Sequence, residues 1–407
     1  MFFKTHPPLM PSVTLEALHP PGTLLTIRTE MDRMRFALPI DEEFRLDSAS
    51  GVMLTIVGNM PVICHENTAS PDIQAFMRLA GLQPGTLILP YETEPEATAL
   101  ARAHLLEGRP VAYIYPLPMA VSLHPGLLVS DQLYGWLNDK QNLENLVDLE
   151  HLPPYVLIKP AEANSVQDLF PGKPIFIKAC HAGASGAGYD IHHCPDSEKR
   201  AAAIRWMLDY SEHLTAIRVE MALEIATSWC VNLAILAEDC RYLGSAAQIF
   251  SSPGKQTGSR IDPDDLPHEN VIKLALNIGE KARLIGYRGV AGFDIGIDGT
   301  GHPYVFDLNF RLVASTPQVL LHDAAVKRFR GSISESWSMA TKEPLRPVMQ
   351  TLKRYVETGQ FIPTRIYEGT MLSRGTSVIS GFVVGNNLQE ILELSNEMQS
   401  SLPDHSH

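Results

Sequence analysis

Two acids, an amide and an arginine lie close together near residue 300. Within 289–312, GVAGFDIGIDGTGHPYVFDLNFRL, side chains alternate between the two faces of a strand, so Asp307, Asn309 and Arg311 point the same way. Asp294, on the preceding strand of a predicted hairpin, faces them. Mg²⁺ takes such oxygen ligands and fills its remaining positions with water and phosphate. The segment therefore predicts a metal site at Asp294, Asp307 and Asn309, and the alternative is the polar outer face of an exposed hairpin.

A glycine-rich loop follows a strand that carries a lysine. The segment 175–193 reads IFIKACHAGASGAGYDIHH, with Gly183, Gly186 and Gly188 in the loop. An extended segment follows, which excludes the dinucleotide fingerprint, and no Gly-Lys-Ser/Thr ends the loop, which excludes a Walker loop. Its bare N–H groups can still fold over phosphate. Lys178 has apolar neighbours and needs an anionic partner. Bound phosphate is one interpretation, and a mobile hairpin turn is the other.

The composition excludes several classes of protein. The 407 residues carry a formal net charge of −13 with scattered Lys and Arg, which argues against binding to nucleic acid. The five cysteines show no metal-binding spacing and favour reduced thiols. No run of about 18 apolar residues occurs, so neither a signal peptide nor a membrane anchor is expected. We therefore expect a cytoplasmic protein.

The elements that must position these residues differ before and after residue 150. Before it, short strands alternate with helices, which predicts a small parallel sheet. The strands are expected at 52–58, 86–90 and 110–115, and the helices near 71–81 and 94–107.

After residue 150 the strands are longer and more often consecutive. Strands are expected at 174–180, 188–193, 216–223, 229–236 and 242–250, and a hairpin at 289–298 and 302–310. Helices are expected at 131–148, 196–211 and 266–286. The Gly- and Ser-rich segment 250–265 looks like a mobile cover or a simple solvated loop.

Taken in order, these pieces resemble the ATP-grasp superfamily over about residues 131–320. The resemblance rests on the NDK segment with Lys140, the strand with Lys178, the loop 183–188, the VEMALE segment 219–224 and the final DLNFR. The family commonly has Glu where this chain has Asp307.

The resemblance implies an α/β and α+β fold, in which a small parallel α/β domain precedes a two-lobed ATP-grasp fold. The implied domains are an N-terminal pre-ATP-grasp-like domain (1–130), a small lobe with the glycine-rich loop (131–225), a large lobe with the metal site (226–330) and a C-terminal closing segment (331–407).

The resemblance also implies roles for individual residues. Lys140 and Lys178 would contact the ATP phosphates, Gly183, Ser185, Gly186 and Gly188 would close over them, Glu220, Met221 and Ala222 would meet the adenine edge, and Glu224 would hold the ribose. Asp294, Asp307 and Asn309 would hold Mg²⁺, with Mn²⁺ as an alternative.

The implied activity is an ATP-dependent carboxylate–amine ligase that forms an amide through an acylphosphate and releases ADP and phosphate. Arg311 and Lys178 would be the catalytic residues, with Arg311 stabilising the tetrahedral oxyanion. The partners are a small carboxylate donor and an amine acceptor, such as amino acids or peptide-like metabolites. A non-catalytic ATP-binding module and a phosphotransferase acting on a hydroxyl are the alternatives, and the sequence leaves a monomer or a homodimer open.

Overall fold

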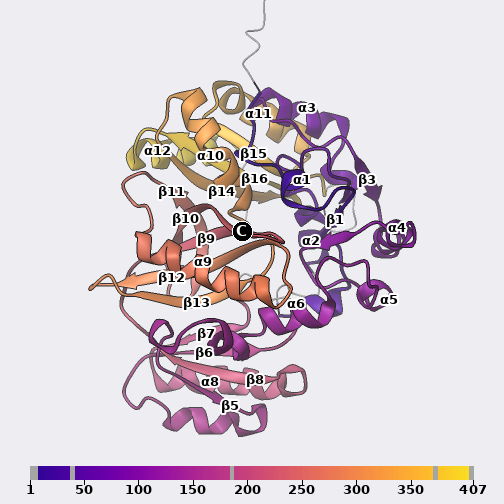
Figure 1. The fold of residues 1–407 in the computed structure, drawn as a ribbon. Coiled ribbons are helices and arrows are strands. Elements are labelled where there is room, and N and C mark those ends of the chain that lie inside the picture. The colour runs from indigo at the N-terminus through magenta and orange to yellow at the C-terminus, as the bar shows by residue number, and fades with distance from the viewer. Residues whose placement is uncertain (1–7, 37–41, 184–187, 370–374, 403–407) are drawn as a thin grey trace, which may run out of the picture.

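The strands of the protein form three sheets in a computed structural model that describes residues 8–36, 42–183, 188–369 and 375–402 (Figure 1). A four-stranded parallel sheet belongs to the N-terminal part, a four-stranded antiparallel sheet follows, and an eight-stranded antiparallel sheet takes in the remainder. Figure 1 places the second sheet at one end of the molecule and the last strands of the third at the other. The predicted mixed α/β architecture with a parallel N-terminal sheet is confirmed.

The N-terminal sheet has the strand order β3-β2-β1-β4. Its strands are β1 (Leu24–Thr26), β2 (Val62–His65), β3 (Ile88–Tyr91) and β4 (Val111–Tyr113). Its helices are α1 (Leu15–Leu18), α2 (Glu43–Ala49), α3 (Pro71–Leu79), α4 (Glu94–Leu106) and α5 (Met119–Ser122), with short 3₁₀ turns at Met31–Met34 and Glu66–Thr68. Helix α3 begins where sequence signals place it, because the Ser70 side chain accepts from the N–H of Ile73 and Pro71 fills the first turn.

The strand expected at 52–58 is absent, and that prediction was wrong. The segment is a series of turns with a buried apolar interior, and the strand follows at 62–65 instead. Gly58 has a φ of 71°, a left-handed conformation that interrupts an extended chain. The apolar run therefore predicts the burial of this segment correctly and its conformation wrongly. A short apolar run indicates burial but does not distinguish a strand from other buried conformations.

The second sheet, of order β5-β8-β6-β7, carries the predicted lysine strand. Its strands are β5 (Tyr155–Ile158), β6 (Ile175–Cys180), β7 (Ile191–Cys194) and β8 (Ala216–Met221), covered by α8 (Ser197–Asp209). The 3₁₀ segments in and next to it are Leu149–His151, Pro160–Asp168 and Ser211–His213. The expected helix over 131–148 is interrupted, and consists of α6 (Asp131–Asn138), a 3₁₀ turn (Lys140–Asn142) and α7 (Leu143–Leu146).

The eight-stranded sheet has the order β13-β12-β9-β10-β11-β14-β16-β15. Its strands are β9 (Ile225–Ile235), β10 (Cys240–Ser252), β11 (Lys255–Ile261), β12 (Gly289–Asp298), β13 (Pro303–Asn309), β14 (Ile333–Thr341), β15 (Phe361–Tyr367) and β16 (Ser377–Gly385). Its helices are α9 (Glu269–Leu284), α10 (Thr316–Phe329), α11 (Leu345–Thr358) and α12 (Leu388–Ser401). Residues after 331 thus extend the same sheet as the predicted metal strands.

The segment expected as a mobile cover is a β-hairpin. Strands β10 and β11 pair from Ala247 with Arg260 to Ser252 with Lys255, with two irregularities in register. The Gly and Ser residues of this segment therefore lie in a hairpin with a tight turn rather than in an unstructured loop. None of the helices in the described ranges is both long and apolar enough to cross a bilayer.

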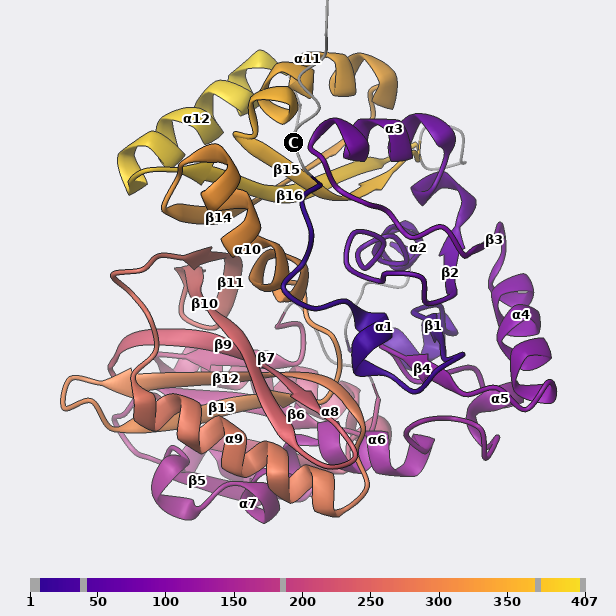
Figure 2. The ribbon, with the colours of Figure 1, turned by 45° about the horizontal axis from the view of Figure 1, so that its top comes forward.

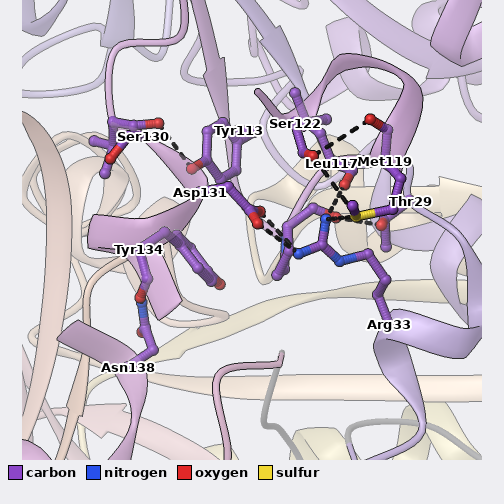
Figure 3. Close-up of polar contacts among 12 residues, drawn as sticks. Thr29, Arg33, Tyr113, Leu117, Met119, Ser122, Ser130, Asp131, Tyr134 and Asn138 are labelled. Atoms are coloured by element: carbon purple, nitrogen blue, oxygen red, sulfur yellow. Dashed lines mark hydrogen bonds and ion pairs between the residues drawn. The ribbon is translucent and has the colours of Figure 1, made fainter. Parts of the chain in front are cut away.

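Helix α6 joins the N-terminal domain to the large sheet. The guanidinium of Arg33 donates two hydrogen bonds to the Asp131 carboxylate, at 2.8 and 2.9 Å (Figure 3). At the other end of the helix the Asn138 side chain accepts from the backbone N–H of Phe310 at 3.0 Å. One helix therefore fixes the N-terminal domain relative to the end of β13, where the predicted metal ligands lie.

Candidate active site

A cavity of about 1120 Å³ brings together residues from all three sheets. The second sheet contributes Lys178 on β6 and Glu220 on β8, and the large sheet contributes residues from every one of its strands, including Asp294, Asp307 and Arg365. The N-terminal domain closes one side. Figure 2 shows this domain beside the C-terminal strands and helices of the chain. Gly188, the last residue of the predicted glycine loop, and the acidic hairpin therefore border one shared space.

The acids of the hairpin lie directly opposite one another. Asp294 on β12 pairs in register with Asp307 on β13. Burial, followed by the negative charge of Asp307, raises the pKa of Asp294 to about 7. Asn309, two residues further along β13, accepts from the Arg311 guanidinium at 2.7 Å. Two crowded carboxylates, one of them hard to ionise, make a local excess of negative potential that a cation would relieve.

This donor set fits a magnesium ion bound together with phosphate. In the described part of the chain no group of three or more His, Cys, Asp and Glu side chains could enclose a metal by itself. Two carboxylates and one amide are a partial shell, and Mg²⁺ commonly uses such a shell and completes it with substrate phosphate and water. Asp294, Asp307 and Asn309 all line the cavity.

Lys178 is held by a carboxylate and a carbonyl. Its Nζ lies 2.5 Å from Glu220 Oε2 and donates to the carbonyl of Phe306 at 2.9 Å. Glu220 also accepts from Arg218 at 2.5 Å. Burial alone would raise the pKa of Glu220, but the two cations outweigh it and keep that pKa below its usual value. The anionic partner that the sequence required for Lys178 is therefore present within the protein, and the amine still borders the cavity.

Lys140 lies behind the cavity wall. Its Nζ lies 2.8 Å from Asp190 Oδ2 and 3.7 Å from Asp307 Oδ1, and its side chain is only 2% exposed. Lys140 thus braces the base of the glycine loop against the acidic strand and is absent from the cavity lining. A direct contact between Lys140 and phosphate remains a prediction.

The expected adenine segment forms an apolar stretch of wall. Met221, Leu223 and Ile225 line the cavity beside Phe176. The backbone N–H of Met221 already donates to the carbonyl of Pro154, and that of Ala222 to the carbonyl of Pro174. Ala222 and Glu224 are not part of the lining, and their roles toward adenine and ribose stay predictions.

The glycine loop meets the β10–β11 hairpin. Gly188 has a φ of 72°, and a β-carbon there would lie 3.0 Å from the carbonyl of Gly254, at the hairpin turn. Both glycines line the cavity, whereas Gly183 does not. Ser185 and Gly186 fall outside the described residues. The close approach explains why a residue with a side chain would disturb position 188.

Sequence reasoning missed one side of the cavity. Arg365 and Tyr115 line it, together with an apolar wall of Ile27, Ala49, Val52, Met53 and Ile114. A signal for Arg365 was present, because FIPTRIY (361–367) places a cation among apolar strand neighbours, as IFIKAC does for Lys178. Tyr115 had no such signal, since an aromatic residue after a strand is usual in any core.

Two family models match the chain. Residues 153–309 match a model described as "L-aspartate--L-methionine ligase, ATP grasp", and residues 14–135 match "L-aspartate--L-methionine ligase N-terminal domain". Together the two ranges take in more than half of the chain and include the acidic hairpin, Lys178 and the apolar wall.

Solved structures share the whole architecture at low identity. An N5-carboxyaminoimidazole synthetase from Staphylococcus aureus, complexed with ADP, matches with a TM-score of 0.59 and 8% identity, covering 94% of this chain and 97% of its own. An L-amino acid ligase from Bacillus licheniformis matches with a TM-score of 0.53 and 13% identity, covering 94% of this chain and 98% of its own. At such identities the likeness establishes the fold.

Proposed function

We propose that this chain, which belongs to the ATP-grasp family of carboxylate–amine ligases, joins L-aspartate to L-methionine. The family models that match both of its parts carry these two amino acids in their description. The observation that carries the proposal is the shared cavity, where the acids Asp294 and Asp307, the amide Asn309 and the cations Lys178 and Arg311 border one space.

The reaction has two steps. A carboxylate oxygen of aspartate attacks the γ-phosphorus of ATP, the bond from that phosphorus to the β–γ bridging oxygen breaks, and ADP leaves. The amino group of methionine then attacks the acyl carbon, loses a proton and expels phosphate, which leaves an amide. Both steps bring anions together, so positive charge positioned beforehand lowers the barrier.

Lys178 and the proposed metal site would both supply this positive charge. Asp294, Asp307 and Asn309 would hold Mg²⁺, which when bound would neutralise charge on the transferring phosphoryl group. Lys178 is oriented by Glu220 and by the carbonyl of Phe306, so its ammonium group is fixed before the substrate arrives.

Arg311 would stabilise the oxyanion of the second step. Its guanidinium is anchored by the Asn309 side chain and lies 5.8 Å from the centre of the Tyr115 ring. Burial would lower the pKa of Arg311, but the surrounding tyrosines and the acids of the hairpin keep it raised. A fully charged, anchored fork next to the acids is suited to an oxyanion that forms only in the transition state.

Product analysis tests the proposal. The purified protein is incubated with ATP and Mg²⁺ and with aspartate and methionine, singly and together, while ADP release is followed and the products are identified by mass spectrometry. ADP formation that needs both amino acids, with a product of dipeptide mass, supports the proposal. ADP with a phosphorylated alcohol, no ADP at all, or an amide from a different pair of amino acids would overturn it.

A further inference from the structure

Arg365 is a cation in the cavity wall that has no anionic partner among the described residues. It lies on β15, partly buried, and no described residue forms an ion pair with it. Its Nη2 donates to Ser380 Oγ at 2.8 Å, and that hydroxyl is 2.7 Å from Ser338 Oγ. The Nε atom is buried and has no hydrogen-bond acceptor. The protein thus orients the guanidinium and leaves part of its donor capacity unused.

An unused, desolvated cation is costly, so such an arrangement calls for a ligand. A buried donor without an acceptor costs about 1–3 kcal/mol, and more when it is charged. Burial is the largest effect on the pKa of Arg365 and lowers it, Tyr115 opposes that effect, and Arg45 on α2 adds to it. Arg45, which carries a charge of the same sign, therefore does not neutralise Arg365. An anion is the ligand that this position attracts.

An apolar wall lies close to this cation. Ile27 directly follows β1 and Ile114 directly follows β4, so both sit at the carboxyl ends of parallel strands, where open parallel sheets bind ligands. Met53 belongs to the turns that follow α2, and α2 packs against β15, the strand of Arg365. All three apolar residues are at most 3% exposed.

Tyr115 connects this region to the reaction centre. Its ring centre lies 5.8 Å from the guanidinium carbon of Arg311, and Tyr115 lines the same cavity as Arg365. Arg311 and Arg365 thus line one cavity together with this tyrosine. Two cations in one cavity suit a single amino acid whose amino group reaches the acyl carbon while its carboxylate contacts the second cation.

We propose that Arg365 binds the α-carboxylate of the amine substrate, and that the wall formed by Ile27, Met53 and Ile114 takes its apolar side chain. The assignment rests on the proposed function and adds to it a position for one substrate. Methionine carries both features, a free carboxylate and an unbranched apolar side chain. Aspartate lacks the apolar side chain, so the wall selects against it at this position.

Steady-state kinetics on three variants test the proposal. Arg365→Met removes the charge at similar volume, Arg365→Lys keeps the charge without the fork, and Ser380→Ala removes only the orienting hydroxyl. Losing a charge-assisted contact should raise the KM for methionine about 30-fold in Arg365→Met, which is about 2 kcal/mol at 1.4 kcal/mol per tenfold. Arg365→Lys and Ser380→Ala should give smaller increases, and the KM for aspartate should stay within about twofold in all three.

A second comparison uses L-methioninamide, which has no carboxylate. The wild-type enzyme should use it at least about tenfold less efficiently than methionine, and Arg365→Met should lose that preference. A rise in the KM for aspartate instead, an unchanged KM for methionine, or a preference retained in Arg365→Met would each overturn the assignment.

Calorimetry separates this proposal from the proposed function. If the wild-type protein releases no ADP with aspartate and methionine, the proposed function fails, and the titration of methionine into wild-type and Arg365→Met protein with ADP and Mg²⁺ decides the binding assignment. Heat with the wild type that disappears in the variant supports it. Equal heats, or none with either protein, overturn it.

Discussion

Lys178 and Arg365 line the same cavity from two different sheets, and their surroundings differ. Lys178 has a carboxylate at 2.5 Å and a carbonyl at 2.9 Å. Arg365 has one serine hydroxyl and a buried Nε without an acceptor. Lys178 therefore has a carboxylate and a carbonyl partner within the protein, while Arg365 has a buried N–H donor that no described group accepts.

The difference separates two uses of a buried charge. A paired cation such as Lys178 keeps its position whether or not substrate is present, and removing it would leave the buried Glu220 with Arg218 as its remaining cationic partner. A cation without an anionic partner, such as Arg365, lowers the free energy of unfolding of the ligand-free protein. A bound anion would offset this loss. Removing the charge should therefore lower the stability of the protein at Lys178 but not at Arg365, although it weakens catalysis or substrate binding at both positions.

The largest effect is expected for Lys178→Met. Turnover should fall by at least about 10²-fold, as for the loss of a positioned charge. The free energy of unfolding should also fall by about 3 kcal/mol, because Glu220 is left without its lysine. Rates of ADP release and urea unfolding curves measure the two effects.

The matched control is Lys173→Met, the same chemical change five residues earlier on an exposed side chain. It should leave both the turnover and the free energy of unfolding within experimental error. Near-wild-type turnover in Lys178→Met, with normal folding, would remove Lys178 from the proposed chemistry.

Asp190→Asn should lower the free energy of unfolding by about 3 kcal/mol, since it breaks the buried pair with Lys140. Burial alone would raise the pKa of Asp190, but Lys140 outweighs it and holds that pKa below the ordinary value of 3.8. The stabilisation by the pair is thus complete above about pH 4 and is lost as the pH falls further. The difference between wild type and variant should shrink in the same range.

Asp168→Asn, at an exposed acid, is the control for this variant and should show no such difference at any pH. A wild-type-like unfolding curve for Asp190→Asn at neutral pH would mean that the Lys140 pair contributes nothing to stability.

Asp294→Asn should stabilise the metal-free protein, and by more at higher pH. The pKa of Asp294 is about 7 in the fold and 3.8 ordinarily, so the folded state binds the proton more tightly than the unfolded chain does. Ionising this acid therefore destabilises the fold progressively between about pH 4 and pH 7. The advantage of the variant should grow by about 1.4 kcal/mol per pH unit in that window.

Thermal unfolding between pH 5 and pH 8 in the presence of a chelator measures this trend, with Asp307→Asn as the comparison. Burial is the larger cause of the raised pKa of Asp294 and the charge of Asp307 the smaller, so Asp307→Asn should weaken the same pH dependence without abolishing it. A pH-independent difference for Asp294→Asn would contradict the burial and crowding of this acid.

The residues proposed to bind nucleotide and metal could be predicted from the sequence because they violate the usual pattern of their elements. Lys178 on an apolar strand, and Asp307 with Asn309 on one face of another, are costly unless they meet a partner or a ligand. The register of Asp294 opposite Asp307 followed from the hairpin alone. Such local contradictions identify sites without knowledge of the fold.

The residues proposed to bind the amine substrate could not be predicted from the sequence because they come from distant parts of the chain. Ile27, Met53 and Ile114 are ordinary core residues by sequence, and their role depends on the N-terminal domain lying against β15. Arg365 did carry a local contradiction, since it is a cation among the apolar residues of a strand. The position of Lys140 behind the wall also depends on Asp190, fifty residues away, which no spacing rule supplies.

The smallest effect, and the sharpest contrast with Lys178, is expected for the stability of Arg365→Met. Methionine there removes a desolvated charge and its buried Nε without stranding an acid, because no described carboxylate pairs with Arg365. The free energy of unfolding should stay unchanged or rise by about 1 kcal/mol. Arg28→Met, which breaks the contacts of a buried arginine to Glu43 and Asp47, should instead be destabilising. Urea unfolding of both variants without ligands measures their free energies of unfolding. A loss of stability in Arg365→Met as large as in Arg28→Met would mean that Arg365 stabilises the fold rather than binding a substrate.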